Sequence, residues 1–301
     1  MKRLRLGFVW TVGVLALFGC SVPLQQTSSA SVLPQPGEES GAPRSPASKT
    51  VAGQTPPQVI QGPEVENFLA QAKIVGMKDI GKGVTLPRKA TLELNGVTNF
   101  AVFKTIDEKP EHPVSPGGDL EPAFQDSWRT EVAAYEFDKL VGFGFVPATV
   151  KRSYENQEGS LQLWVVSKMD EETRAKQKIQ PPDRAAWENQ VATLHLWDAL
   201  IYNTDRQAGN LLITEQWKII AIDHSRTFRP FAQLKDSKSL TRFSKSMLAK
   251  LATLTEPQLK SKLDPYLDPF QIRAVLKRRD AIEALAKKLV AQKGEAAVLF
   301  E

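Results

Sequence analysis

The sequence predicts an α+β fold in which a sheet comes first and helices follow. Residues 73–106 contain runs of β-branched residues interrupted by glycines, by Pro87 and by the turn pair Asn95-Gly96, as in short antiparallel strands. From about residue 182 onward, the apolar residues recur at helical spacing instead. Strands and helices that occupy separate parts of a chain are typical of α+β proteins, so we expect two segregated parts.

The first twenty residues have the pattern of a secretory signal followed by a single cysteine. A basic start precedes an uncharged, mostly apolar run from Leu6 to Phe18. This run of about 13 residues is shorter than the roughly 20 that span a bilayer as a helix, so a permanent membrane span is the weaker interpretation. Cys20 is the only cysteine in the chain, so no internal disulfide can form. We therefore expect an exported protein with residues 1–19 as its signal peptide.

The ending Leu-Phe-Gly-Cys resembles the bacterial lipobox, in which the cysteine is lipidated and becomes the mature N-terminus. The resemblance implies a lipid on Cys20 that anchors the chain to the cell-envelope membrane, on its extracytoplasmic side. The alternative is an ordinary signal peptide with an incidental cysteine. Residues 20–63 are rich in Ser, Pro, Gln, Gly and Thr, a composition that buries too little apolar surface to fold. We predict that they form a disordered tether between the membrane and a folded body.

The charge of the chain argues against a nucleic-acid partner. The sequence has 39 Lys and Arg residues and 34 Asp and Glu residues, and three of the basic residues lie in the signal. The rest of the chain carries 36 basic and 34 acidic residues, without a concentrated basic patch. We therefore expect no nucleic acid among its partners.

Two helices of the second half have recognisable ends. Asp183 is the N-cap expected for a helix whose apolar residues form one stripe. Asp268 and Pro269 open a long helix that Gly294 closes. These signals place well-bounded helices in the part of the chain that follows the strands.

Between these helices lies a short β-hairpin pattern with polar residues around it. The runs "NLLIT" and "WKIIAID" are joined at Glu215-Gln216, which places Asn210 and Asp223 near opposite ends of one rung. Their oxygens could hold a hard cation such as Mg²⁺, which prefers carboxylate and carbonyl ligands completed by substrate phosphates. Asp205 lies just upstream, where it can reach a hydroxyl nucleophile. The alternative is that all three are ordinary turn and cap residues.

The pattern Asp-x-x-x-x-Asn, hairpin, Asp resembles the catalytic and metal-binding loops of the protein-kinase-like fold. "DRQAGNLLI" and "IDHSRTF" are most similar to atypical branches, namely the phosphatidylinositol 3-/4-kinases and the secreted Golgi casein-kinase-like group. The resemblance implies a two-lobed fold with a small β-rich N-lobe (64–168) and a larger helical C-lobe (169–301). It also implies ATP and Mg²⁺ or Mn²⁺ as cofactors, with Asp205 as catalytic base and with Asn210 and Asp223 as metal ligands.

Two positions depart from the family pattern. Gln207 stands where the lipid kinases have His, which raises the question of how the catalytic loop is braced. His224 and Ser225 replace Phe-Gly, and this removes the Phe packing switch of regulated kinases.

The same resemblance implies that the first half supplies a phosphate-covering turn and a strand lysine. Gly81 and Gly83 lie between two strand-like runs, where backbone N–H groups could approach phosphate, although an ordinary hairpin turn is the alternative. Lys104 has apolar neighbours on both faces of its predicted strand, "FAVFKTI", and a lysine in such surroundings needs a charged partner. Many strand lysines are simply solvated, but we favour a functional role for this one.

A helix predicted in "DSWRTEVAAYEFDKLV" offers two candidates for the glutamate that pairs with Lys104. Glu131 and Glu136 lie on opposite flanks of its apolar stripe, so geometry does not choose between them. The resemblance to secreted kinase-like proteins favours Glu131. Residues 107–125 form a Pro/Gly-rich insertion, either a lid or a surface loop. Residues 160–169 are expected to run as a strand into the connection where adenine would lie.

Two classes of function remain open from the sequence. The first is a lipid-anchored, exported kinase that transfers the γ-phosphoryl group of ATP to a hydroxyl acceptor on a protein or lipid. The second is a catalytically inactive kinase-like module that binds a nucleotide, a lipid headgroup or a protein. The presence of Lys104, Asp205, Asn210 and Asp223 favours the enzyme, whereas export favours the module because ATP is scarce outside the cytoplasm.

Overall fold

The computed structural model describes residues 58–81, 87–111, 113 and 120–301. The predictions for the signal peptide, for Cys20, for most of the tether and for Gly83 lie outside these residues. No helix in the described ranges combines the length and the apolar character needed to cross a membrane.

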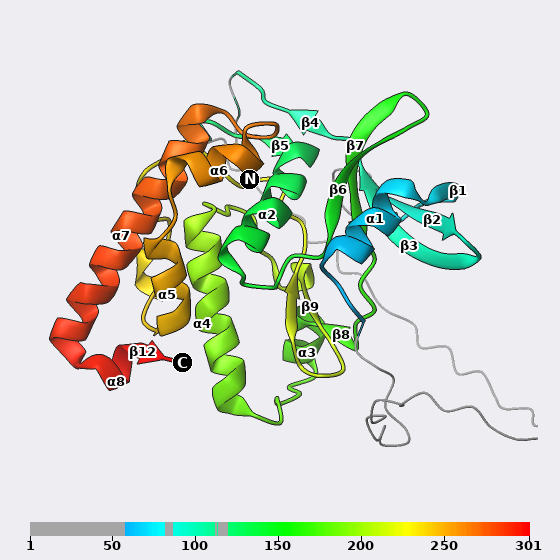
Figure 1. Cartoon of the computed structure of the whole chain (residues 1–301). Coiled ribbons are helices and arrows are strands. Elements are labelled where there is room, and N and C mark those ends of the chain that lie inside the picture. Colours follow the sequence, from blue (N-terminus) through cyan, green and yellow to red (C-terminus); the bar gives the residue numbers. More distant parts are fainter. Residues whose placement is uncertain (1–57, 82–86, 112, 114–119) are drawn as a thin grey trace, which may run out of the picture. The chain divides into compact units, whose positions relative to one another are not determined.

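A five-stranded antiparallel sheet forms the N-terminal region, with the strand order β1-β2-β3-β7-β6 (Figure 1). The sheet consists of β1 (Lys73–Asp79), β2 (Arg88–Leu94), β3 (Val97–Lys104), β6 (Thr149–Tyr154) and β7 (Gln157–Leu163). The predicted turn Asn95-Gly96 joins β2 to β3, with φ values of 51° and 77°. Positive φ at both central residues is what a two-residue hairpin requires, so the turn residues fix the register of these strands.

Two helices pack on this sheet. α1 (Pro63–Gln71) contacts β6, β7 and β2, and α2 (Trp128–Val141) contacts β6 and β7. Ser127 caps α2 by accepting a hydrogen bond from the Arg129 N–H, and Gly142 ends it in the left-handed conformation. The short strands β4 (Asp107–Glu108) and β5 (Asp126–Ser127) pair with each other and deliver the chain to α2.

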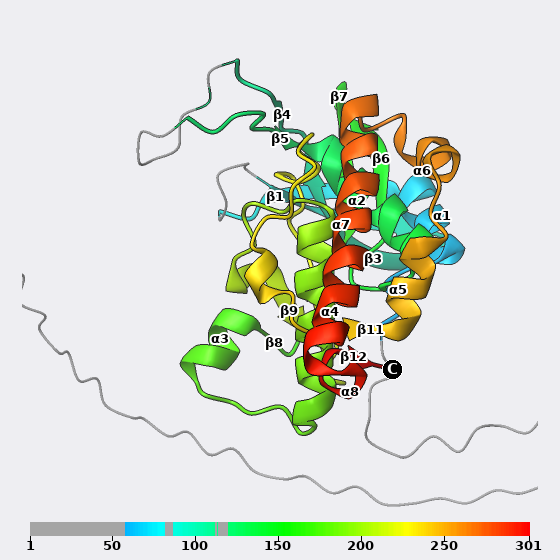
Figure 2. The ribbon, with the colours of Figure 1, turned by 90° about the vertical axis from the view of Figure 1, so that its left-hand side faces the viewer.

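The C-terminal region is mainly helical. α4 (Arg184–Leu200) begins at the predicted cap Asp183, and α7 (Pro269–Lys293) has Asp268 and Gly294 at its ends, as predicted. α4 and α7 pack together, as Figure 2 shows. The remaining helices are α3 (Glu171–Lys176), α5 (Lys245–Ala252), α6 (Glu256–Leu263) and α8 (Glu295–Val298), with 3₁₀ turns at Ala208–Asn210 (η1) and Ser237–Ser239 (η2).

Short strands complete this region. β8 (Met169–Asp170), β9 (Leu211–Ile213) and β10 (Ile219–Ala221) form a three-stranded sheet in the order β10-β9-β8, while β11 (Phe243–Ser244) pairs in parallel with β12 (Leu299–Phe300). Sheet first and helices second is the α+β arrangement that the sequence predicts.

One aromatic cluster joins the two regions: Phe137 of α2 stacks on Trp197 of α4 at a centroid distance of 5.7 Å and meets Phe228 edge-on. The two regions therefore share a hydrophobic core around the C-terminal half of α2.

Candidate active site

Lys104 lies at the centre of a buried charge cluster between the two regions. Its Nζ donates to Glu131 Oε1 at 2.5 Å and to Asp223 Oδ1 at 2.7 Å. Lys104 is at the end of β3, Glu131 is in the first turn of α2, and Asp223 follows β10. Three segments that are far apart in sequence therefore meet at one ammonium group.

The backbone of the neighbouring strand makes room for this lysine. β3 and β7 pair with Lys104 opposite Ser160, and Gly159 comes just before it. A Cβ atom on Gly159 would lie 2.3 Å from the Lys104 carbonyl oxygen, which is too close for any side chain. Glu136 lies away from this cluster and pairs with Lys139 at 2.8 Å, so Glu131 is the α2 glutamate that meets Lys104.

The charge states in the cluster follow from burial and pairing. Burial alone would lower the pKa of Lys104, but the Glu131 and Asp223 carboxylates outweigh it and raise that pKa. Burial likewise opposes ionisation of Asp223, yet Lys104, and to a lesser degree Arg206 and Arg226, hold its pKa below the usual value. Burial raises the pKa of Glu131, against the attraction of Lys104. At neutral pH, Lys104 is a cation beside an ionised Asp223.

Asn210 and Asp223 lie side by side at the open end of the β9–β10 hairpin. Leu211 pairs with Ala221, and the Ile222 N–H donates to the Asn210 carbonyl, so Asn210 faces Ile222 and Asp223 is one residue further along. The expectation of a shared rung is therefore wrong by one residue. The side chains still meet, with Asn210 Nδ2 3.4 Å from Asp223 Oδ2, because Asp223 has a left-handed backbone with φ of 61°. Such a conformation is costly for a non-glycine residue and is often found at functional sites.

The pair suits a hard divalent cation in its donor chemistry. One carboxylate and one amide oxygen match the few protein ligands that Mg²⁺ takes when substrate phosphates and water complete its shell. Within the described ranges, no group of three or more His, Cys, Asp or Glu residues is arranged to hold a metal without such help. Asp223 Oδ1 is bound to Lys104, which leaves Oδ2 on the side of Asn210.

Asp205 is held by three partners just before η1. Its N–H donates to Asn203 Oδ1 at 2.9 Å, while its carboxylate accepts from Gln207 Nε2 at 3.2 Å and from Arg226 Nη1 at 3.1 Å. Gln207 thus contacts the predicted base directly. The carboxylate remains about one third exposed, with its side chain at 35% of full exposure, so an acceptor can approach it.

Arg226 belongs to the site although it lies outside the motif Asp-x-x-x-x-Asn, hairpin, Asp. Arg226 Nε donates to Asp126 Oδ2 at 2.8 Å, so one guanidinium bridges Asp205 to the end of the 107–125 insertion. Arg229 is buried and pairs with Glu121 of the same insertion. The stretch 120–125 therefore lies against the segment after Asp223, and only long-range pairing reveals this.

A cavity of about 410 Å³ is lined by neighbours of the cluster, because Val102 precedes Lys104 by two residues in β3 and Ile222 directly precedes Asp223. Its walls come from β3, from the connection after β7 and from the β9–β10 hairpin, through Val102, Leu163, Trp164, Val166, Leu212 and Ile222. The strand predicted over 160–169 ends at Leu163, and residues 164–167 form the connection that lines this cavity.

Gly81 follows β1 with φ of +69° and belongs to the turn toward β2, where the Ile80 N–H donates to the Pro87 carbonyl.

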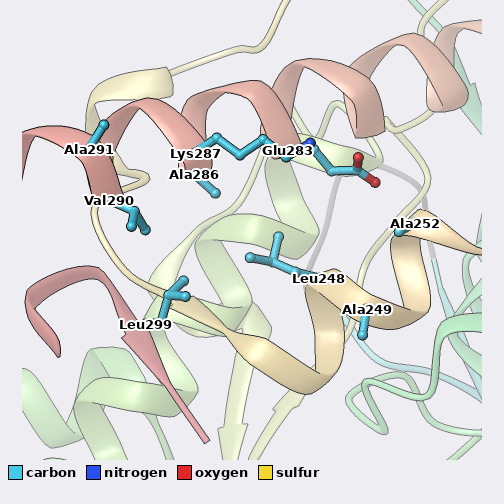
Figure 3. Close-up of a pocket in the computed structure, with 9 residues that line it drawn as sticks. All are labelled: Leu248, Ala249, Ala252, Glu283, Ala286, Lys287, Val290, Ala291 and Leu299. Atoms are coloured by element: carbon cyan, nitrogen blue, oxygen red, sulfur yellow. The ribbon is translucent and has the colours of Figure 1, made fainter. Parts of the chain in front are cut away.

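A larger cavity lies elsewhere, between α5 and α7 (Figure 3). Its volume is about 550 Å³, and small apolar side chains such as Leu248, Ala286 and Val290 line it, with Leu299 at one side. Glu283 and Lys287 are the charged residues on its wall. None of the predicted catalytic or metal-binding residues reaches it, so size alone does not locate the site.

Comparison with known proteins identifies the fold. No protein-family model matches this chain, and no curated protein matches it. Its structure is similar to that of a hydra Fam20 protein solved with a sugar, with a TM-score of 0.57 and 18% sequence identity, covering 79% of this chain and 91% of that one. It is also similar to the golgi casein kinase, with a TM-score of 0.54 and 16% identity over 78% of each chain. The fold is protein-kinase-like, as the motifs of the sequence predicted.

Proposed function

We propose that this chain is an atypical kinase that transfers the γ-phosphoryl group of ATP to a hydroxyl group on a protein or lipid, with Mg²⁺ or Mn²⁺. The observation that carries the proposal is the double pairing of Lys104 with Glu131 and Asp223. A buried cation held by two carboxylates at the end of a strand, beside a cavity large enough for a purine, is the arrangement that phosphoryl transfer needs to position phosphates.

The reaction can be assigned to residues of this chain. Lys104 would hold phosphate oxygens, and Glu131 would keep its ammonium group in place. A divalent cation held by Asn210 and Asp223 would neutralise phosphate charge. Asp205 would accept the proton of the acceptor's hydroxyl group while the hydroxyl oxygen forms a bond to the γ-phosphorus. The bond from the γ-phosphorus to the β–γ bridging oxygen would break, and ADP would leave with the electron pair.

A second candidate is a kinase-like binding module without turnover. The observation in its favour is that both carboxylate oxygens of Asp205 already accept hydrogen bonds, from Gln207 and from Arg226. These contacts take two of the roughly four acceptor positions of the carboxylate, as in a side chain that only braces its loop. The module would bind nucleotide and metal through the same Lys104 and Asp223.

Nucleotide binding is the first test. ATP with Mg²⁺ or Mn²⁺ should raise the melting temperature of the protein, because a ligand at about 100 times its Kd stabilises the folded state by about 2.7 kcal/mol. Either cation without nucleotide should give a much smaller shift. No shift with ATP and both cations would contradict the kinase and the nucleotide-binding module together.

Two substitutions separate the enzyme from the module. Asp223→Ala should abolish both metal-dependent ATP binding and transfer, because a metal ligand contributes to the bound complex and to the transition state alike. Asp205→Ala should keep ATP binding and lower transfer or autophosphorylation by about 100-fold or more, because a base acts mainly in the transition state. Glu215→Gln, in the exposed hairpin turn, is the matched control and should change neither. If Asp205→Ala had no effect on any transfer, the module would be favoured.

The membrane anchor is a separate proposal that rests on the sequence around Cys20. Cys20→Ser should abolish labelling by a fatty-acid probe and release the protein from the membrane fraction, because the chain has no other cysteine to modify. Leu24→Ser, in the predicted tether, serves as the control and should leave both unchanged. If Cys20→Ser is processed and stays equally membrane-bound, then the lipid-anchor proposal is wrong.

A further inference from the structure

One carboxylate of α4 contacts the catalytic loop at two points. Asp198 accepts from Arg206, through Nη2 at 2.9 Å and Nε at 3.1 and 3.2 Å, and from Asn203 Nδ2 at 2.9 Å. Both donors flank Asp205, which lies between them in sequence. Asp198 therefore contacts the loop on either side of the predicted base.

Each of the two donors also forms a hydrogen bond with a predicted site residue or with its neighbour in sequence. Asn203 uses its other end, Oδ1, to accept the Asp205 N–H at 2.9 Å. Arg206 uses Nη1 to donate to the Ile222 carbonyl at 2.7 Å, on the residue before Asp223. Two successive hydrogen bonds thus connect the Asp198 carboxylate to the Asp205 N–H through Asn203. Two others connect it to the Ile222 carbonyl through Arg206.

His224 closes the same network from the other side. Its Nε2 receives Trp197 Nε1 at 3.3 Å and lies 3.0 Å from Arg206 Nη2, and its backbone N–H donates to Glu131 Oε2 at 3.0 Å. Burial, together with the charges of Arg206 and Lys104, lowers the pKa of His224 well below its usual value. The ring is therefore neutral and accepts at Nε2, in the position where regulated kinases have Phe.

The network is largely removed from water. The Asp198 and Arg206 side chains retain 15% and 12% of their exposure, and the His224 side chain retains none. A paired charge in such surroundings has a fixed geometry, because breaking the pair would leave a buried ion without a partner. The exposed ion pair Arg184–Glu188 on the same helix lacks this property, because its side chains are 85% and 49% exposed.

We propose that Asp198 is a positioning residue that sets the spacing between Asp205 and Asp223 through Asn203 and Arg206. This rests on the proposed function in so far as Asp205 is the base and Asp223 the metal ligand. A purely structural ion pair would affect folding alone, whereas a positioning residue affects the chemical step in molecules that are fully folded.

The test is Asp198→Asn, which keeps the shape of the side chain and removes its charge. We expect kcat for transfer or autophosphorylation to fall by about 30-fold or more, with KM for ATP changed by less than about threefold, because the binding residues Lys104 and Asp223 keep their own partners. Asp198→Glu should recover part of the rate, and Glu188→Gln on the same helix should leave it unchanged. A fall in melting temperature with unchanged kcat would overturn the proposal.

Asn203→Ala provides a second test that leaves the Asp198–Arg206 pair intact. It removes the acceptor of the Asp205 N–H together with the Asn203 donor to Asp198, so kcat should fall while the melting temperature changes little. In the double variant with Asp198→Asn, the two losses should be less than additive, because both act on the same loop. Fully additive losses would mean that Asp198 does not act through Asn203.

Hydrogen exchange distinguishes a failure of this proposal from a failure of the proposed function. In Asp198→Asn, amide exchange should rise in peptides covering 203–207 and 222–225, with α4 itself unchanged. This readout needs no activity. If the wild type transfers no phosphate but the exchange rises as stated, the kinase proposal fails and Asp198 still positions the loop. If neither peptide changes, the positioning role is excluded.

Discussion

Two buried cations of this protein, Lys104 and Arg278, are held in opposite ways. Lys104 contacts two carboxylates, and its pKa is raised. Arg278 of α7 donates to main-chain carbonyls, those of Leu200, Arg229 and Phe231 at 2.8, 3.0 and 2.5 Å, and burial lowers its pKa to about 9. Carbonyl oxygens satisfy N–H donors without neutralising charge, whereas carboxylates do both.

Under the proposed function, the difference separates a phosphate-binding cation from a structural one. Carboxylates around Lys104 keep it protonated, as the proposed contact with phosphate requires. Carbonyls around Arg278 tie the end of α4 and the segment after Asp223 to α7, with Tyr202 beneath the guanidinium at 5.5 Å. The first arrangement can exchange a partner for a ligand, but the second would leave three buried carbonyls without donors.

The strongest test of this comparison exchanges both cations for methionine. Lys104→Met should lower ATP affinity and reduce transfer by about 100-fold or more while the protein stays folded, because a preorganised charge at the phosphates is lost. Arg278→Met should lower the free energy of unfolding by about 3 kcal/mol or more, because several buried carbonyls lose their donors. Urea unfolding and ATP binding, measured on both variants, decide the matter.

The matched control for Arg278 is Lys277→Met, its exposed neighbour on α7, which should be neutral in both measurements. If Arg278→Met unfolds no more easily than Lys277→Met, Arg278 is not a structural cation. If the ATP affinity of folded Arg278→Met falls as far as that of Lys104→Met, the two cations do not differ in function.

These two cations also mark what the sequence could predict. Lys104 was recognisable because a strand lysine with apolar neighbours needs a partner, and the caps at Asp183 and Asp268 are local signals that the structure confirms. Arg278 lies in "LKRRD" beside Lys277 and Arg279, where nothing local distinguishes a buried arginine from a solvated one. Its burial depends on packing of α7 against α4, which is a long-range property.

The site shows the same limit. Asp205, Asn210 and Asp223 are close in sequence and were found through their spacing. Asp126 and Asp198, which hold Arg226 and Arg206, lie outside that motif, and their partners are determined by tertiary contacts. Helical geometry alone could not choose between Glu131 and Glu136, because the two lie on equivalent flanks of the apolar stripe. The position of β3 relative to α2 decides the choice.

Arg226 provides an intermediate case that sharpens the comparison. It is partly exposed, at 27% for the side chain, and bridges Asp126 to Asp205. Arg226→Met should lower kcat by about tenfold with ATP affinity unchanged, because Asp205 loses an orienting partner but the nucleotide residues do not. The control is Arg242→Met, at a residue whose guanidinium lies over the Phe300 ring, and it should leave kcat unchanged. A rise in kcat for Arg226→Met would instead identify this contact as inhibitory.

Gly159→Ala tests whether the position of Lys104 depends on the backbone of β7. A Cβ atom at residue 159 would lie 2.3 Å from the Lys104 carbonyl oxygen, so the strands must separate. We expect a loss of about 1–3 kcal/mol in the free energy of unfolding, the usual cost of overpacking, together with weaker ATP binding. Gly76→Ala, in β1 of the same sheet, meets Thr91 at 3.5 Å and should be tolerated in both respects.

The smallest expected effect concerns alkaline pH and has opposite signs for the two cations. The folded-state pKa of Lys104 is raised, so its stabilising contribution is complete below its usual pKa of about 10.4 and is lost as pH rises further. The folded-state pKa of Arg278 is lowered to about 9, so the cost of burying its charge diminishes as pH rises above that value. The stability difference between wild type and Lys104→Met should therefore shrink between pH 10 and about 11.5, whereas the difference for Arg278→Met should grow. Urea unfolding at several pH values measures both, and parallel curves for the two variants would mean that carboxylate and carbonyl partners are equivalent for a buried cation.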